Sequence, residues 1–298
     1  MNVPTSVIQF FIDIIGKLPV PVRVIVGRTL GYLVGLIPTR EGKIASLQMR
    51  TFLPKGTKIP SVASIFANFG QSALEATNFK PILENIDRYI EGPSREFFQS
   101  LKDGKRPTVA LTAHASNFDL LAAYVVHMGG ELVTVAREAR NPGLQEALAK
   151  IRENYGMTTI WRNQSSSARA LVRALHAGKI VAALIDQDLK LTSMFSPFFG
   201  RPASTPVAIL ELAQHHKARM YTGFIVRTGL MKYKILVEEI DSSLPPAEVL
   251  RIYHERLEAV IVQYPEQWVW VHKRWRTMAD GKVLSSREYI NYLTHEAS

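Results

Sequence analysis

Apolar residues in the middle of the chain fall into short runs that alternate with stretches of helical spacing. Runs rich in β-branched residues are followed by segments in which apolar residues recur every three or four positions. The predicted strands cover residues 107–113, 131–136, 158–161 and 180–185, and the predicted helices between them lie near 117–128, 143–155 and 165–177. Apolar strands that alternate with helices are typical of an α/β fold with a mostly parallel central sheet flanked by helices.

The chain extends this pattern on both sides. A helical stretch lies near residues 62–79, before the first strand. Two further strands and a last helix are predicted at residues 219–227, 231–238 and 246–263. The dipeptide Thr228-Gly229 joins the two strands and predicts a β-hairpin. The sequence shows no internal repeat and no low-complexity linker, so we expect the catalytic core to run from about residue 80 to the end.

The first 40 residues form two apolar segments. Pro19 and Pro21 separate them, and Arg23 and Arg28 interrupt the second one. Neither segment therefore reaches the roughly 18 to 20 uncharged residues that a membrane-spanning helix needs. We interpret residues 1–40 as an apolar helical hairpin that lies in a membrane interface, with two ordinary core helices as the alternative. A signal peptide fits less well, because no basic region precedes the first apolar segment.

Charge and composition limit the possible functions. The chain has 36 Lys and Arg against 26 Asp and Glu, a net charge of +10, and 47% hydrophobic residues. We expect such a protein to have a large core and to be drawn to membrane headgroups, acidic proteins or nucleic acid. The absence of cysteine excludes disulfides, thiolate metal sites and a cysteine nucleophile. The sequence also lacks the dinucleotide, phosphate-loop, H-E-x-x-H and G-x-S-x-G motifs.

The stretch HASNFD, residues 114–119, combines a helix start with reactive side chains. His114 ends a predicted strand, and ligands of open α/β sheets bind beyond the carboxyl ends of the strands. One interpretation is a simple cap, with Ser116 as N-cap and Asp119 three residues later. The other is a general base, in which Asp119 fixes the tautomer of His114. A base without its own nucleophile suits activation of a substrate hydroxyl for attack on a thioester, with the oxyanion near the helix N-terminus.

These residues resemble the H-x-x-x-x-[DE] motif of the glycerolipid and lysophospholipid acyltransferases. A narrower likeness is to the late acyltransferases of lipid A biosynthesis, the lauroyl and myristoyl transferases of Kdo-lipid A. Their form of the motif is filled here by His114, Ser116, Asn117, Phe118 and Asp119. Further blocks resemble the family in the same order: VAREARNPGLQEALAKIRENYG (135–156), IDQD (185–188), FFGRPASTP (198–206) and YPEQWVWVHKRWR (264–276). The lipid A branch commonly has glutamate where this chain has aspartate, which leaves the acceptor open.

The resemblance implies a membrane-associated O-acyltransferase whose domain covers residues 41–298. It would move a fatty acyl chain from acyl carrier protein, or less often coenzyme A, to a hydroxyl of a lipid A precursor, an anionic glycolipid. His114 would be the general base and Asp119 its partner, with no covalent acyl-enzyme, metal or prosthetic group. The protein would act at the cytoplasmic face of the bacterial inner membrane, as a peripheral or monotopic protein.

The resemblance also implies residues that bind substrate. Arg137 and Arg162 match basic positions of the family, where they would hold a phosphate of the lipid or of phosphopantetheine. Surface salt bridges are the alternative for both. Asp186, Gln187 and Asp188 close another strand at the same end of the sheet. There they would contact substrate or support the arginines, unless they only cap the next loop.

Three further features leave alternatives open. Asn117 either orients the acceptor or shapes the backbone turn. The apolar stretch LTSMFSPFFG, residues 191–200, either lines the acyl chain, dips into a bilayer or packs in the core. Trp268, Trp270 and Trp275 alternate with basic residues, a mixture that is found both at membrane interfaces and in nucleic-acid sites. The resemblance to the acyltransferases favours the membrane interface, with a structural role as a further alternative.

Other functions share parts of this pattern. Acyltransferases of other glycolipids, such as mannosylated phosphatidylinositol, or of lysophospholipids form the alternative within the same reaction class. A non-catalytic lipid-binding relative is a second alternative, although the intact pair His114 and Asp119 argues against it. We expect no nucleic-acid partner, because only the net charge points to one.

Overall fold

A seven-stranded sheet forms the centre of the molecule. The computed structural model describes residues 4–104, 106–139, 141–162 and 166–296. Within them the strands follow the order β1-β9-β8-β2-β5-β3-β4, and every neighbouring pair is parallel except β8 with β9. The bounds are β1 Ile90–Glu91, β2 Thr108–Thr112, β3 Leu132–Ala136, β4 Thr158–Trp161, β5 Ile180–Leu184, β8 Arg219–Gly229 and β9 Lys232–Ile240. The predicted α/β class and the hairpin of β8 and β9 are confirmed.

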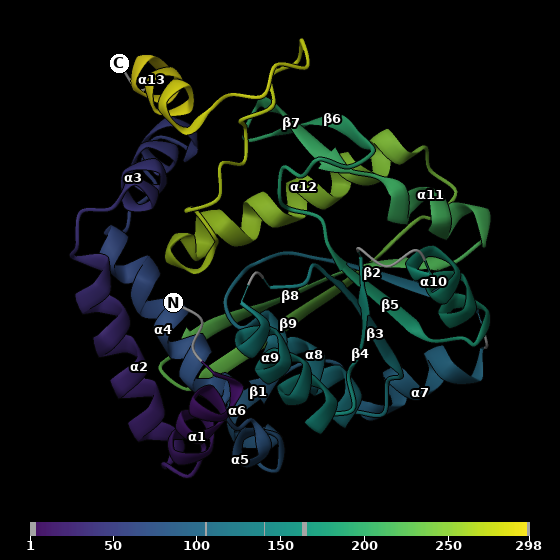
Figure 1. The fold of residues 1–298 in the computed structure, drawn as a ribbon. Coiled ribbons are helices and arrows are strands. Elements are labelled where there is room, and N and C mark those ends of the chain that lie inside the picture. The colour runs from purple at the N-terminus through teal and green to yellow at the C-terminus, as the bar shows by residue number, and fades with distance from the viewer. Residues whose placement is uncertain (1–3, 105, 140, 163–165, 297–298) are drawn as a thin grey trace.

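Helices cover both faces of this sheet (Figure 1). One face carries α7 Arg95–Asp103, α8 Phe118–His127 and α9 Pro142–Asn154, and the other carries α10 Ser167–His176, α11 Ala208–His215 and α12 Pro246–Gln263. The two faces have separate apolar clusters because side chains alternate along each strand. On β8, Tyr221 and Ile225 belong to the cluster under α8, whereas Phe224 belongs to the cluster under α12.

The crossover connections decide which strands are neighbours. From β2 the chain passes through α8 to β3 and through α9 to β4, and it then returns through α10 to β5, between β2 and β3. The next crossover, through α11, leads to β8 on the other side of β2. The chain thus leaves β2 and β5 in opposite directions. The carboxyl ends of these two strands form the switch point at which open α/β sheets bind ligands.

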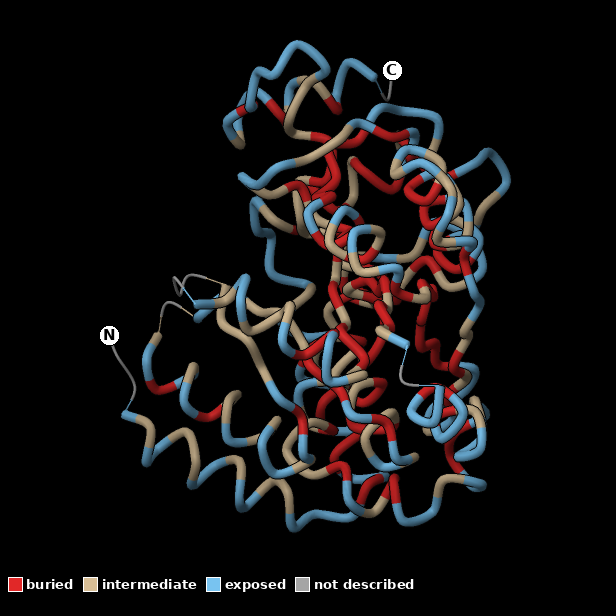
Figure 2. Tube along the Cα trace, turned by 90° about the vertical axis from the view of Figure 1, so that its right-hand side faces the viewer, coloured by how far each residue is buried: buried red, intermediate tan, exposed pale blue. Residues whose placement is uncertain are grey.

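The first four helices lie beside the sheet (Figure 1): α1 Thr5–Gly16, α2 Val20–Gly35, α3 Arg40–Phe52 and α4 Val62–Ala76. Glycines bring α2 close to α4, since a Cβ on Gly31 would lie 2.1 Å from the carbonyl oxygen of Phe66. The helix α1 instead contacts α9, and no residue of α1 is buried (Figure 2). Two N-terminal helices therefore exist as predicted, but α4 and α9 are their main packing partners.

None of the helices in the described residues alone has both the length and the apolar character of a membrane span. Taken together, α2 and α3 meet both criteria, with a bend of 92° between them.

Within the stretch 191–200, residues Ser193–Phe198 form β6, which pairs with β7 Arg201–Pro206 in a small antiparallel sheet. Phe198 is fully buried, and its ring packs against the rings of Trp275 and His254. Phe195 on the same strand is exposed. The part of this stretch around Phe198 therefore packs in the core, as one of the three interpretations requires.

The membrane-interface interpretation of Trp268, Trp270 and Trp275 is wrong in this structure, because all three side chains are buried. Their ring nitrogens donate to acceptors inside the protein, and Trp270 donates to the carbonyl of Pro265 at 2.7 Å. The segment follows the 3-10 helix Pro265–Gln267. The remaining elements are α5 Lys80–Leu83, α6 Ile86–Tyr89 and α13 Ser286–Glu296.

Candidate active site

His114 and Asp186 meet at the switch point, after β2 and β5. Atom Nδ1 of His114 lies 2.7 Å from Oδ1 of Asp186, and the main-chain N–H of His114 donates to Oδ2 at 2.9 Å. When the carboxylate accepts the proton of Nδ1, the neutral ring keeps Nε2 free of hydrogen and able to take a proton. The His114 side chain is 28% exposed, while that of Asp186 is fully buried. This pair is therefore built to present one basic nitrogen to a ligand.

The Asp186 carboxylate is held in its ionised form. The indole N–H of Trp268 donates to its Oδ2 at 2.9 Å. Burial raises the pKa of this carboxyl, but the charge of His114 and the hydrogen bonds from His114 and Trp268 outweigh burial and hold its pKa below the ordinary value. A charged carboxylate here orients the ring and stabilises the imidazolium that forms when His114 takes a proton.

Asn117 is the N-cap of helix α8, at the end of the turn that follows β2. Its Oδ1 accepts from the N–H of Leu120 at 3.1 Å. The alternative of Ser116 as the N-cap is therefore wrong. Ser116 has a left-handed φ of 51°, and its N–H donates to the carbonyl of Gln267 at 2.7 Å. This sharp turn follows His114 directly and helps to fix the position of its backbone.

A buried ion pair supports the same turn from the other side. Glu75 of α4 and Arg227 of β8 lie 3.1 Å apart, with side chains 1% and 4% exposed. The Glu75 carboxylate also accepts from Nδ2 of Asn117 at 2.8 Å and from the hydroxyl of Tyr233. Asn117 thus shapes the turn, and it is not one of the described residues that line the cavity below.

The expected contact between His114 and Asp119 is not found, because Asp186 occupies the position beside Nδ1. Asp119, in the first turn of α8, points toward α9. Its Oδ1 accepts from Nε and Nη2 of Arg152 at 3.2 and 3.1 Å. Asp119 still lines the cavity together with His114. The two residues therefore belong to one site without forming the predicted pair.

The residues after Asp186 point in different directions. Gln187 lines the cavity. Asp188 is buried, and its carboxylate accepts from the N–H and the hydroxyl of Thr277 at 2.8 and 2.9 Å. The N–H of Asp188 donates to Nε2 of His272, whose pKa burial lowers to about 4. Asp188 thus anchors the C-terminal segment beneath the site.

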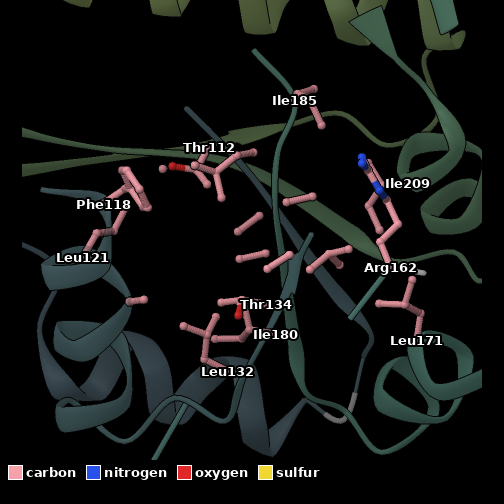
Figure 3. Close-up of a pocket in the computed structure, with 18 of the residues that line it drawn as sticks. Thr112, Phe118, Leu121, Leu132, Thr134, Arg162, Leu171, Ile180, Ile185 and Ile209 are labelled. Carbon is pink, nitrogen blue, oxygen red and sulfur yellow. The ribbon is translucent and has the colours of Figure 1, made fainter. Parts of the chain in front are cut away.

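An apolar cavity of about 1120 Å³ extends from His114 (Figure 3). Leu121 of α8 lies on one side of the strands, and Leu171 of α10 and Ile209 of α11 lie on the other. Apolar pockets of this size with a few convergent polar groups are typical ligand sites, and this one is large enough for an alkyl chain.

The cavity reaches both faces of the sheet because β3 and β5 separate. Their pairing ends at Thr134 and Ala182 among the described residues. Beyond this point β3 continues beside β4 and β5 continues beside β2. Val135, Ala183 and Leu184 line the opening between them.

Arg137 and Arg162 line the same cavity at the β3–β4 side. Burial and then the charge of Arg137 lower the pKa of Arg162. No ion pair joins either guanidinium group to an acid in the part of the chain that the structure describes, so the salt-bridge alternative is wrong there. Two neighbouring cations to which the described residues offer no counter-ion form a suitable site for an anionic group.

Sequence reasoning missed Arg152 and the pairing of Asp186 with His114. Asp186 carried a signal, since it ends a second strand of the same sheet, but local spacing favoured Asp119. Arg152 carried none, because it is one of several charged residues on an amphipathic helix.

Comparison with known proteins places these features in context. A sequence model of the bacterial lipid A biosynthesis acyltransferase family matches residues 3–277. A phosphatidylinositol mannoside acyltransferase of Mycobacterium tuberculosis is 25% identical over 142 residues, which cover 47% of this chain and 44% of that relative. A lipid A biosynthesis palmitoleoyltransferase of Escherichia coli is 22% identical over 276 residues, 89% of each chain. A lipid A biosynthesis lauroyltransferase of Escherichia coli is 24% identical over 278 residues, again 89% of each chain.

Proposed function

Since the chain belongs to the bacterial lipid A biosynthesis acyltransferase family, we propose that it transfers a fatty acyl chain from a thioester to a hydroxyl of a lipid A precursor. The observation that carries this proposal is the His114–Asp186 pair at an apolar cavity. Nε2 of His114 takes the hydroxyl proton while the acceptor oxygen attacks the thioester carbonyl. The tetrahedral intermediate then expels the thiolate, which receives that proton from the imidazolium. No acyl-enzyme forms, and this route needs no metal or prosthetic group.

Two local features support the charge changes in this reaction. The negative charge of Asp186 stabilises the imidazolium of His114. Helix α8 begins three residues after Ala115. The positive end of its helix dipole stabilises the negative charge of the oxyanion in the intermediate. Asp119 and Arg152 lie in the cavity wall beside this helix start, where we assign them the binding of the polar part of a substrate.

The two substrates are assigned to different parts of the cavity. The apolar part accepts the fatty acyl chain of the donor. Arg137, Arg162 and Gln187 bind polar groups, with a phosphate of the glycolipid or of the donor's phosphopantetheine at the arginines. Acyl carrier protein is the proposed donor because it is acidic and this chain has a net charge of +10. Their association should weaken as salt is added, and acyl coenzyme A remains the alternative donor.

We further propose that α1 and α2 hold the protein on the cytoplasmic face of the bacterial inner membrane. Exposed apolar side chains on these helices include Phe10, Phe11, Leu30 and Leu33. Such surfaces insert into the headgroup region without crossing the bilayer. Vesicle flotation tests this assignment. The Phe10→Asp and Leu33→Asp double substitution should leave the protein in the soluble fraction, whereas unchanged flotation would contradict it.

The reaction is tested by mass spectrometry of the lipid A fraction from cells with and without the active protein. A single added acyl mass that is absent with His114→Ala is the expected result, and it also gives the chain length. An unchanged lipid A spectrum with a His114-dependent change in another lipid would support a different acceptor. The mycobacterial relative, named for phosphatidylinositol mannoside, makes glycolipids of that kind the second candidate. No His114-dependent change in any lipid would leave a non-catalytic lipid-binding protein.

A further inference from the structure

We propose that Gly223 in β8 determines the longest acyl chain that the cavity accepts. The inference rests on the proposed acyl transfer and adds the residue that sets its chain-length specificity. Gly223 is buried in the middle of an eleven-residue strand and lines the cavity. A Cβ placed on it would meet no heavy atom of the described residues within 4 Å, apart from its chain neighbours.

The backbone does not explain a glycine here. A glycine within a strand destabilises the strand relative to alanine, and it often marks a bulge, a tight bend or a close approach. Gly223 pairs with Val237 in regular register, and the irregularity of this ladder lies further on, between Arg227 and Gly229. Its φ lies outside the left-handed region, and no other backbone approaches the Cβ position. The remaining explanation for a glycine at position 223 is the space that its missing side chain leaves in the cavity.

That space belongs to the α8 side of the sheet. Tyr221 and Ile225, two residues before and after Gly223, contribute to the apolar cluster under α8. The neighbouring strands also carry small residues on this face of the sheet. Ala110 on β2 and Ala182 on β5 pair with each other and line the cavity. Because these positions carry small side chains, a cavity remains between the sheet and α8.

The order of the strands gives the cavity a direction. The neighbouring residues Arg137 and Arg162 line the cavity near β3 and β4, the two strands at one edge of the sheet. His114 follows β2, and Gly223 lies on β8, one strand further from the arginines. We place the thioester of the donor at His114 and its polar part toward the arginines, so that its alkyl chain extends toward Gly223 and Val237 of β9, which line the same cavity.

The test replaces Gly223 with Ala, Val and Leu and supplies an equimolar series of saturated acyl thioesters of increasing length. The longest product should become shorter in the order Ala, Val, Leu. One methylene changes discrimination in an apolar pocket by roughly 10- to 200-fold. Gly229→Val is the matched control, since Gly229 lies on the same strand, is exposed, and a Cβ there meets only Lys232 at an ordinary 3.5 Å. Its product profile should equal that of the wild type.

A separate binding measurement distinguishes failure of this inference from failure of the proposed function. Displacement of a fluorescent fatty acid by unlabelled fatty acids of graded length reports the cavity without turnover. If the wild type transfers no acyl group but Gly223→Val still shifts displacement toward shorter chains, the proposed reaction fails and the role of Gly223 stands. An unchanged length profile in folded Gly223→Leu, or an equal loss at every length, overturns the role of Gly223.

Discussion

The hydrogen bonds of Asp186 predict a large catalytic effect of the Asp186→Asn substitution. In the native site Oδ2 accepts from two N–H groups, the main chain of His114 and the indole of Trp268, each at 2.9 Å. An asparagine must therefore place its amide oxygen at the Oδ2 position, which turns its NH₂ group toward Nδ1 of His114. Nδ1 then becomes an acceptor, and the neutral ring carries its hydrogen on Nε2. The base faces its substrate in the wrong tautomer.

The magnitude follows from this reversal together with the loss of the negative charge. The equivalent change in a serine-protease triad lowers kcat about 10⁴-fold while it preserves the geometry. That factor corresponds to about 5.5 kcal/mol of transition-state stabilisation. The assay is steady-state transfer from an acyl thioester to a purified lipid acceptor, with thermal unfolding to verify that the variant folds. Because His114 and Asp186 act as one unit, the double variant with His114→Ala should be hardly slower than His114→Ala alone.

Asp188→Asn is the matched control, since Asp188 is a buried carboxylate two residues away that binds Thr277. Its expected effect is on stability, with kcat within about tenfold of the wild type. A folded Asp186→Asn variant that keeps kcat within tenfold of the wild type would refute this role of Asp186. Single effects at His114 and Asp186 that multiply in the double variant would refute it as well.

Three further predictions concern stability. Arg227→Met should lower the unfolding free energy by about 3 to 5 kcal/mol because it leaves the Glu75 charge buried and unpaired. A urea titration in which the unfolding free energy falls by less than about 1 kcal/mol would contradict this. Gly31→Ala should lower the melting temperature by several degrees, since its methyl group would overlap α4; an unchanged melting curve, as expected for exposed Thr29→Ala, would exclude the close packing. Burial, aided by the charge of Arg274, lowers the pKa of His254 to about 3. As the pH falls below about 6.5, only the unfolded chain therefore takes up this proton, and the unfolding free energy falls by about 1.4 kcal/mol per pH unit. Urea titrations of His254→Gln across that range should show a shallower slope, and an equal slope would assign the pH dependence to other groups.

Local sequence determined most of the secondary structure of this protein. The apolar strands and amphipathic helices have periods of about two and 3.6 residues, which are properties of neighbouring residues along the chain. For this reason β4 and α12 begin and end where the sequence predicts them. The small sheet of β6 and β7 was missed, because its prolines and mixed polar residues give no strand period.

The same local signals located the start of the candidate site. His114 at the end of β2 and the helix start after it are visible in six consecutive letters. The role of Asn117 as cap could not be separated from that of Ser116, since both side chains are good N-caps and only the backbone conformation decides between them.

Tertiary structure alone decided what His114 contacts. Asp119 is five residues away in sequence and turns to Arg152, whereas Asp186 is 72 residues away and is bonded to the ring. The order of the strands produces this result, because β5 returns to lie beside β2 after the chain has already formed β3 and β4. No local period encodes which strands are neighbours, since that choice depends on how the crossover helices pack on both faces of the sheet. The open space at Gly223 depends on the same packing, which the letter G in a strand cannot reveal by itself.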